Sequence, residues 1–205
     1  MQTFDPLIIP KARVKARRQK WGVPENAVLV LLPGRLTRWK GQLVAIEAMM
    51  HLDESYHLVL LGDAQGREQY VSELNNFAVQ CGVWREMYLP GHDADVAAAY
   101  LAADIVICPS IDPEAFGRTA AEAQALGRPV IAADHGGAVE VVEHGVTGWR
   151  TPPGDAKALA NAILAVDDLT GVSGARDRIA ANYSKTALQK ALLGVYADLM
   201  KPILK

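Results

Sequence analysis

Short apolar runs that alternate with helix-period segments constrain the fold of this 205-residue chain more than any other feature. Runs with strand character, each bounded by Gly, Pro or Asp, lie at residues 27–33, 57–62, 86–91, 104–110 and 128–134. Segments with the length and composition of crossover helices lie at 41–52, 67–81, 95–102 and 118–126. Strands that are apolar throughout are buried on both faces, and intervening helices make neighbouring strands parallel. The sequence therefore predicts an α/β fold with a doubly wound parallel sheet, helices on both faces, and ligands outside the carboxyl ends of the strands.

The composition predicts an ordinary globular domain and narrows its partners. Half of the residues are hydrophobic and the formal net charge is -2, which gives no case for a nucleic-acid partner. Cys81 and Cys108 have neither the density of a disulfide scaffold nor the spacing of a zinc site, so we expect two buried, free thiols. We find no signal segment and no apolar run of about 18 residues, which favours a cytoplasmic protein.

The segment "KARVKARRQK" at residues 11–20 is strongly basic, and Gly22 and Pro24 end any helix that it forms. One interpretation is a helix that contacts anionic lipid or an acidic partner, which would place the protein peripherally at the inner membrane face. The other is a solvated helix face that leads into the domain. We favour the solvated face, because the apolar side of the helix, with Val14 and Trp21, is thin.

The stretch "PGRLTRWKGQ" behind the first strand has the features of an anion site. Gly34 follows the strand, Arg35 and Lys40 lie five positions apart, and Gly41 opens a helix. Free N–H groups at a helix start and two cations across the turn can neutralise a diphosphate. The alternative is that both cations are ordinary surface charges. The stretch matches neither a Walker loop nor the Gly-x-Gly-x-x-Gly fingerprint, which argues against a P-loop ATPase and a standard nicotinamide site.

Two carboxylates lie in the stretch "PEAFGRTAAEAQALGRPVIAADHGG" at residues 113–137. Glu114 is in a loop, and Glu122 is in an Ala-rich segment that we expect to be helical. A carboxylate presents two acceptor oxygens, so one Glu can bridge adjacent ribose hydroxyls while the other holds hydroxyls of a second sugar. The alternative for Glu122 is that it solvates a helix.

Several motifs occur along the chain in a fixed order: "GRLTRWKG", "LVLLGD", "AAYLAADIVICPS", "PEAFGRTAAEAQALGRPVIAADHGGAVEVV" and "GVTGWRTPPGD". In this order they closely resemble the nucleotide-binding half of retaining glycosyltransferases of family 4, which have the GT-B fold. The resemblance covers about residues 25–200, and its strongest part is the Glu-x7-Glu signature formed by Glu114 and Glu122. It implies that the doubly wound sheet is Rossmann-like and forms one half of a GT-B fold.

The resemblance also implies roles for the matching positions. Arg35 and Lys40 match the pair that binds the donor pyrophosphate, and Glu114 matches a donor-sugar contact; these three are implied to be catalytic. Glu122 matches the ribose ligand. The other positions implied to contact the nucleotide sugar are Gly34, Gly62, Gly91, His92, Ala115, Phe116, Gly117, Thr119, Gly136 and Gly137. The implied donor is a UDP-, GDP- or ADP-linked sugar, without a further cofactor, and two cations with helix ends replace a metal ion.

The tripeptide "DAD" at residues 93–95 offers a competing interpretation, because it looks like the metal-binding Asp-x-Asp of the other large glycosyltransferase fold. It precedes an Ala-rich helix, so we favour Asp93 or Asp95 as a helix N-cap. The histidines at positions 51, 57, 92, 135 and 144 have no ligand spacing. We therefore predict no metal site and expect the histidines on the surface or in loops.

The predicted organisation has three parts: a linker and basic helix at 1–24, a Rossmann-like donor-nucleotide domain at 25–183, and a C-terminal helix at 184–205 that braces a missing N-terminal GT-B domain. The resemblance implies the donor-binding domain of a retaining, hexosyltransferase-type enzyme that acts on a glycan or lipid-linked acceptor in polysaccharide synthesis. We expect this domain alone to be inactive. The alternative is a non-catalytic nucleotide-sugar binding or regulatory module, and the Glu-x7-Glu context disfavours a sugar-nucleotide epimerase.

Overall fold

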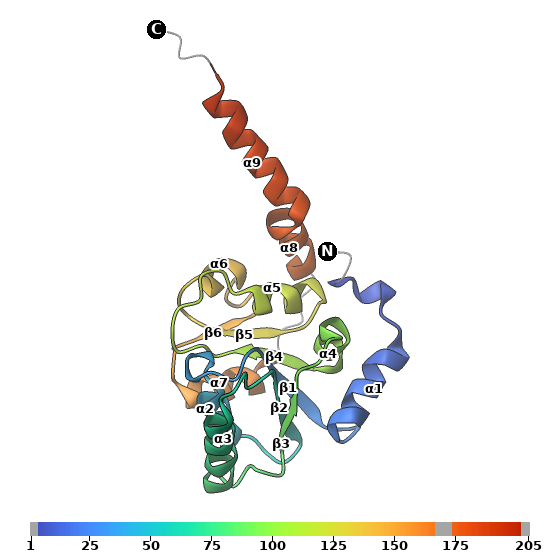
Figure 1. Ribbon diagram of the computed structural model, residues 1–205, viewed down its shortest axis with the longest axis vertical. Coiled ribbons are helices and arrows are strands. Elements are labelled where there is room, and N and C mark those ends of the chain that lie inside the picture. The colour runs from blue at the N-terminus through green and yellow to red at the C-terminus, as the bar shows by residue number, and fades with distance from the viewer. Residues whose placement is uncertain (1–3, 167–173, 202–205) are drawn as a thin grey trace.

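A computed structural model describes residues 4–166 and 174–201, in which six parallel strands form a sheet with helices on both faces (Figure 1). This confirms the predicted α/β class. The strand order is β3-β2-β1-β4-β5-β6, the doubly wound order that reverses between β1 and β4. The strands are β1 (Val28–Pro33), β2 (Tyr56–Leu61), β3 (Met87–Gly91), β4 (Ile105–Cys108), β5 (Val130–Ala133) and β6 (Trp149–Thr151).

The helices divide between the two faces of the sheet. They are α1 (Lys11–Trp21), α2 (Gln42–Met49), α3 (Glu68–Gln80), α4 (Val96–Ala102), α5 (Arg118–Ala125), α6 (Ala138–Val141), α7 (Ala156–Leu164), α8 (Ala175–Tyr183) and α9 (Lys185–Leu199). Helices α2, α3 and α7 contribute to one apolar core, and α1, α4, α5, α6 and α8 contribute to the other. Short 3-10 helices lie at Pro6–Ile8 (η2) and Arg38–Lys40 (η3).

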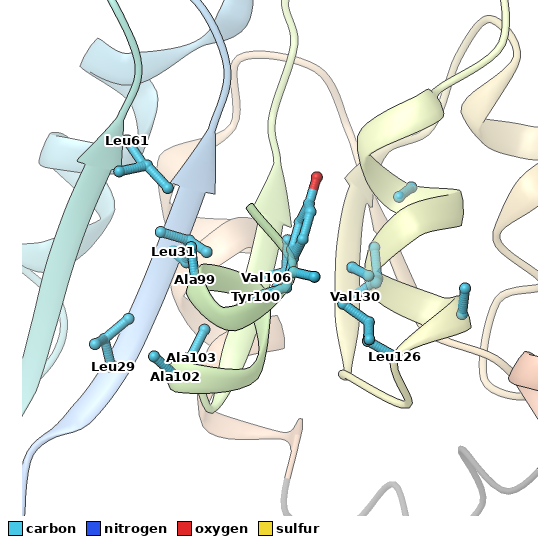
Figure 2. Packing of buried hydrophobic residues seen from close by; sticks show 14 of the residues in the cluster. Leu29, Leu31, Leu61, Ala99, Tyr100, Ala102, Ala103, Val106, Leu126 and Val130 are labelled. Atoms are coloured by element: carbon cyan, nitrogen blue, oxygen red, sulfur yellow. The ribbon is translucent and has the colours of Figure 1, made fainter. Parts of the chain in front are cut away.

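The apolar strand runs are explained by burial on both sides of the sheet. In β1, Leu29 and Leu31 face one core and Val30 and Leu32 face the other, and all four are at most 2% exposed. Figure 2 shows the first of these cores, where Leu29 and Leu31 lie beside α4. Side chains along a strand alternate between faces, so a strand with a helix layer on each side needs apolar residues at every position.

Strand β6 is not among the predicted strands. It is three residues long and lies between Gly148 and Pro152, too short for a periodic pattern to be visible. A Cβ at Gly148 would lie 2.4 Å from the carbonyl oxygen of Val130, so glycine lets the chain approach β5 closely.

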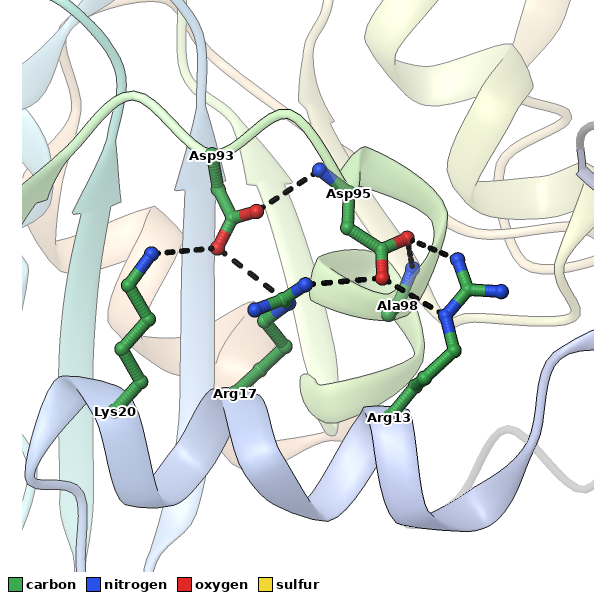
Figure 3. Close-up of polar contacts among 6 residues, drawn as sticks. All are labelled: Arg13, Arg17, Lys20, Asp93, Asp95 and Ala98. Carbon is green, nitrogen blue, oxygen red and sulfur yellow. Dashed lines mark hydrogen bonds and ion pairs between the residues drawn. The ribbon is translucent and has the colours of Figure 1, made fainter.

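Helix α1 contains the basic segment, and several of its cations pair with carboxylates of the same domain. Figure 3 shows Arg13, Arg17 and Lys20 directed toward Asp93 and Asp95 at the start of α4. Further along the same helix, Arg18 donates to Asp104 at 2.5 Å and to the carbonyl oxygens of Ala27 and Ala102. The solvated-face prediction therefore holds for Arg13, Lys15 and Lys20, whose side chains are more than half exposed, but not for Arg17 and Arg18. The acidic partners of these two arginines come from turns about 80 positions away in sequence, where no local pattern reveals them.

Helix α9 projects from the domain (Figure 1) and has no buried residue. Its exposed apolar side chains include Leu188, Leu192, Leu193, Val195, Tyr196 and Leu199. Residues 202–205 of the predicted C-terminal helix and residues 1–3 of the predicted linker lie outside the described residues. The bracing role of α9 stays a prediction.

Three further side chains refine the sequence predictions. Cys81 and Cys108 are free thiols, as expected, but both are half-buried rather than fully buried. Burial raises the pKa of Cys108 to about 12. The expectation that the histidines lie on the surface or in loops is wrong for His57, which lies in β2, is 9% exposed and contacts the Tyr88 hydroxyl at 3.0 Å. Across residues 4–166 and 174–201, no helix is long and apolar enough to cross a membrane.

Candidate functional site

The predicted site residues gather around a cavity of about 500 Å³ at the carboxyl ends of β1, β2 and β3. Six predicted residues line it: Gly34, Arg35, Gly62, His92, Thr119 and Glu122. They come from the loops after three strands and from the first turns of α5. The cavity lies next to the point where the strand order reverses, which is where doubly wound sheets bind ligands.

Two glycines allow the loops of this edge to approach one another. A Cβ at Gly62 would lie 1.8 Å from the carbonyl oxygen of Gly34, so the β1 and β2 loops touch through their backbones. Gly41, at φ +76°, precedes α2, and a Cβ there would lie 1.9 Å from the carbonyl oxygen of Pro109. Any side chain at either position would push these loops apart.

Lys40 and Glu114, two of the three residues implied to be catalytic, form a partly buried ion pair beside the cavity. The Lys40 Nζ lies 2.8 Å from Glu114 Oε1, and the Ser110 hydroxyl donates to the same oxygen at 2.6 Å. The Lys40 and Glu114 side chains are 12% and 15% exposed. Lys40 ends the short helix η3, where its ammonium also lies 4.4 Å from the ring centre of Trp39. The structure thus brings the predicted anion site and the first carboxylate together, while Arg35 lines the cavity itself.

The Gly136–Gly137 turn supports the loop that carries Glu114. The Gly137 amide donates to the carbonyl oxygen of Glu114 at 2.7 Å. Gly136 has φ +58°, and a Cβ at Gly137 would lie 2.5 Å from the Phe116 Cα. These two glycines hold the loop in place and are not part of the lining of the large cavity.

Other predicted residues lie next to the cavity rather than in its wall. Gly91, Ala115, Phe116 and Gly117 are not among its lining residues. The Phe116 ring is 39% exposed and packs edge-on against Tyr183, with 5.3 Å between ring centres. Gly117 has φ +78° and is the N-cap of α5. The free amides of the first turn of α5 therefore follow Glu114 closely in the chain.

Glu122 is held by a tyrosine that the sequence pattern does not reveal as a site residue. The Tyr100 hydroxyl donates to Glu122 Oε2 at 3.0 Å, and Arg118 Nε lies 3.6 Å from Oε1. Burial raises the pKa of Glu122, although both partners act against this shift. Tyr100 is 2% exposed and sits in an Ala-rich helix, so in the sequence it has the appearance of a core residue. The sequence "AAAYLAAD" is the signal that could have identified it, because a buried tyrosine hydroxyl in an otherwise apolar helix needs a hydrogen-bond partner.

The "DAD" tripeptide caps a helix, as favoured. Asp95 is the N-cap of α4 and its Oδ1 accepts from the Ala98 amide at 3.4 Å. Arg13 and Arg17 hydrogen-bond the same carboxylate and lower its pKa to about 2. Among the residues that the structure describes, no three His, Cys, Asp or Glu side chains gather in a way that could hold a metal ion.

The arrangement suits a ligand that has an anionic centre and several hydroxyl groups. Arg35 and the helix starts supply positive potential, while the carboxylate of Glu122 supplies an acceptor across the same cavity. Doubly wound domains commonly bind nucleotides at this edge of the sheet.

The family model for glycosyl transferases group 1 matches residues 14–185. The chain is 38% identical to a D-inositol 3-phosphate glycosyltransferase of Xylanimonas cellulosilytica, over 98% of this chain and 50% of that protein. A glycosyltransferase from Rickettsia africae has a TM-score of 0.91 at 31% identity, over 98% of this chain and 55% of the other. Anabaena HepE in complex with UDP-glucose has a TM-score of 0.86 at 32% identity, over 95% of this chain and 55% of the other.

The chain belongs to the glycosyl transferases group 1 family, as a C-terminal domain of a GT-B glycosyltransferase. It spans about half the length of the curated relatives it matches. The resemblance on which the site residues were predicted is therefore confirmed at the level of this family and fold.

Proposed function

We propose that this domain binds a nucleotide diphosphate sugar in the cavity between Arg35 and Glu122, as the donor half of a retaining glycosyltransferase of family 4. The single observation that carries the proposal is that a cation and a carboxylate line one cavity at the reversal point of the sheet, beside the Lys40–Glu114 pair. The solved complexes of HepE with UDP and UDP-glucose support a nucleotide-sugar donor.

Each part of the donor would meet a different group. Glu122 accepts from the ribose hydroxyls, because the Tyr100 hydroxyl already occupies Oε2 and leaves Oε1 for the ligand. Arg35 and Lys40 neutralise the diphosphate. Glu114, with the amides from Ala115 to Gly117, holds the sugar. Gly34, Gly62, His92 and Thr119 form the walls around the base and the phosphates. Gly91, Gly136 and Gly137 shape the loops behind these walls.

The chemistry that this half can supply is stabilisation of the leaving diphosphate. Arg35, Lys40 and the amides at the start of α5 develop their strongest contacts as negative charge grows on the departing phosphate. This is the contribution that a divalent ion would otherwise make, so we infer metal-independent transfer. In a retaining reaction on the donor's front face, the leaving phosphate accepts the proton of the acceptor hydroxyl.

Transfer also requires an acceptor held against the donor, which we assign to a second, N-terminal GT-B domain. Holding two reactants in line can account for about 7 to 11 kcal/mol of the barrier, and one wall of a cleft cannot supply it. We infer a glycan or lipid-linked acceptor, a hexosyl-type donor sugar, and a place in polysaccharide synthesis in the cytoplasm. Helix α9 would brace the second domain with its exposed apolar face.

The test compares the 205-residue chain with the same chain joined to its N-terminal GT-B partner domain. Sugar release and transfer are measured from UDP-, GDP- and ADP-linked donors. We expect the chain alone to bind a nucleotide and to transfer no sugar, and the joined protein to transfer. Equal transfer by both would refute the two-domain proposal, and binding without transfer by the joined protein would favour a non-catalytic nucleotide-sugar module.

A further inference from the structure

One wall of the donor cavity is the loop between β3 and α4. His92 and Asp93 line the cavity from this loop, and Val96 and Tyr100 line it from the helix that follows. The position of the loop therefore sets the shape of the cavity. Through the hydrogen bond of Tyr100, it also sets the position of the Glu122 carboxylate.

The loop is held by two aspartates that lie side by side. Asp93 Oδ1 accepts from the Asp95 amide at 2.9 Å, and Asp95 in turn caps α4. The side chain of Asp93 is 5% exposed and that of Asp95 is 17% exposed. Two neighbouring carboxylates with so little contact with solvent repel each other unless cations compensate them.

Helix α1 supplies these cations, and Arg17 is the residue that reaches both carboxylates (Figure 3). Its Nη2 donates to Asp95 Oδ2 at 3.0 Å, and its Nε lies 3.5 Å from Asp93 Oδ2. Arg13 contacts Asp95, and Lys20 contacts Asp93 at 3.5 Å. The Arg17 side chain is only 20% exposed, whereas those of Arg13 and Lys20 are 51% and 55% exposed. The fork of its guanidinium can fix the spacing of two carboxylates, which a single ammonium cannot do.

We propose that Arg17 is a positioning residue for nucleotide binding: by bridging Asp93 and Asp95 it fixes the loop before α4 and, through Tyr100, the Glu122 carboxylate that we assign to the ribose. The inference rests on the proposed function, because it requires that a nucleotide occupies this cavity. Arg17 itself does not line the cavity and acts through the loop. Its loss should therefore affect the nucleoside more than the diphosphate, which Arg35 and Lys40 hold from the β1 side.

The experiment measures binding of UDP, GDP, ADP and inorganic pyrophosphate to the 205-residue chain by calorimetric titration. The variants are Arg17→Ala, Arg17→Lys and the matched control Lys15→Ala, whose side chain is on the same helix but pairs with Glu25 away from the loop. Arg17→Ala should weaken the tightest-binding nucleotide about three- to tenfold and leave pyrophosphate unchanged. Arg17→Lys should restore part of the loss, and Lys15→Ala should bind as the parent does.

A purely structural role of Arg17 would lower the unfolding midpoint without separating nucleotide from pyrophosphate. Equal losses for both ligands, or no loss at a temperature where the variant is folded, would overturn the inference. If Arg17→Ala does not fold, Arg17→Lys serves in its place, because it keeps a positive charge beside the two carboxylates but cannot bridge them as the guanidinium does. It should show a smaller loss, again confined to nucleotides, and unchanged nucleotide binding would likewise refute the inference. If the parent chain binds no nucleotide, it is the proposed function that fails.

Discussion

The substitution Glu122→Gln isolates the charge of the carboxylate that we assign to the ribose. It keeps the shape of the side chain and an acceptor for the Tyr100 hydroxyl, so the helix should be undisturbed. With Oε2 bonded to Tyr100 and Oε1 at 3.6 Å from Arg118, one oxygen is left to accept from the ribose. A charged acceptor contributes about 1.5–3 kcal/mol and a neutral one about 0.5–1.5 kcal/mol, so we expect a loss of about 1–1.5 kcal/mol, or about five- to tenfold in Kd.

The loss should depend on pH in a defined direction. Burial raises the pKa of Glu122, and only its ionised form makes the charge-assisted bond. The affinity of the parent chain should therefore fall as the pH is lowered through this raised pKa, while the Gln variant stays constant and the two converge. The raised pKa also means that the carboxyl favours the folded state at pH values below its unfolded pKa and loses that contribution as the pH rises through the folded pKa. At neutral pH, Glu122→Gln should thus unfold at the same temperature as the parent or above it.

The assay is calorimetric titration with UDP, GDP and ADP, followed by the 2′-deoxy form of the tightest ligand. Removing the 2′-hydroxyl should weaken binding to the parent chain more than to Glu122→Gln, because the two changes remove the same contact. Glu47→Gln, on the exposed side of α2, is the matched control and should bind as the parent does. Equal affinities of Glu122→Gln and the parent for every nucleotide would show that the ribose assignment is wrong.

Two further perturbations test the anion site and the loop contact. Replacing Arg35 and Lys40 together by Ala should weaken the binding of nucleoside diphosphates far more than that of nucleosides. Raising the salt concentration should reproduce part of this loss. Unchanged diphosphate binding over a salt series would show that neither cation contacts the diphosphate. Gly62→Ala should lower the free energy of unfolding by about 1–3 kcal/mol in denaturant, because its Cβ would lie 1.8 Å from the Gly34 carbonyl oxygen. Gly194→Ala, in exposed α9, should instead raise it by about 0.5–1 kcal/mol. The opposite order would contradict the close approach of the two loops.

The layered fold could be predicted because it depends on local patterns. Each buried strand is apolar at successive positions, and each crossover helix has its own period, so both can be recognised without knowing the partners. Strand β6 could not be predicted in this way, because a segment of three residues is too short to show a periodic pattern. The gathering of Arg35 and Glu122 at one edge also follows from topology, because parallel strands end on the same side of the sheet.

The contacts that position the site could not be predicted in the same way. The ion pairs of Arg17 join an amino-terminal helix to a loop 78 positions away, and the hydrogen bond of Tyr100 to Glu122 joins two helices. Such pairs depend on the exact packing of elements, which the residues of one segment do not determine. A basic segment in the sequence therefore has the same appearance whether its charges face water or neighbouring carboxylates.

The central position of β1 has a consequence for how the chain folds. On one edge β1 pairs with β2, the next strand along the chain, and on the other it pairs with β4, so that Val30 lies opposite Ile105. During synthesis, β1, β2 and β3 can assemble before β4 is made, and the edge of β1 that pairs with β4 is then unpaired. An unpaired edge of an apolar strand with high β-propensity can template aggregation. Closure of this long-range pairing should therefore limit the folding rate, and refolding at low protein concentration should recover more native domain than refolding at high concentration.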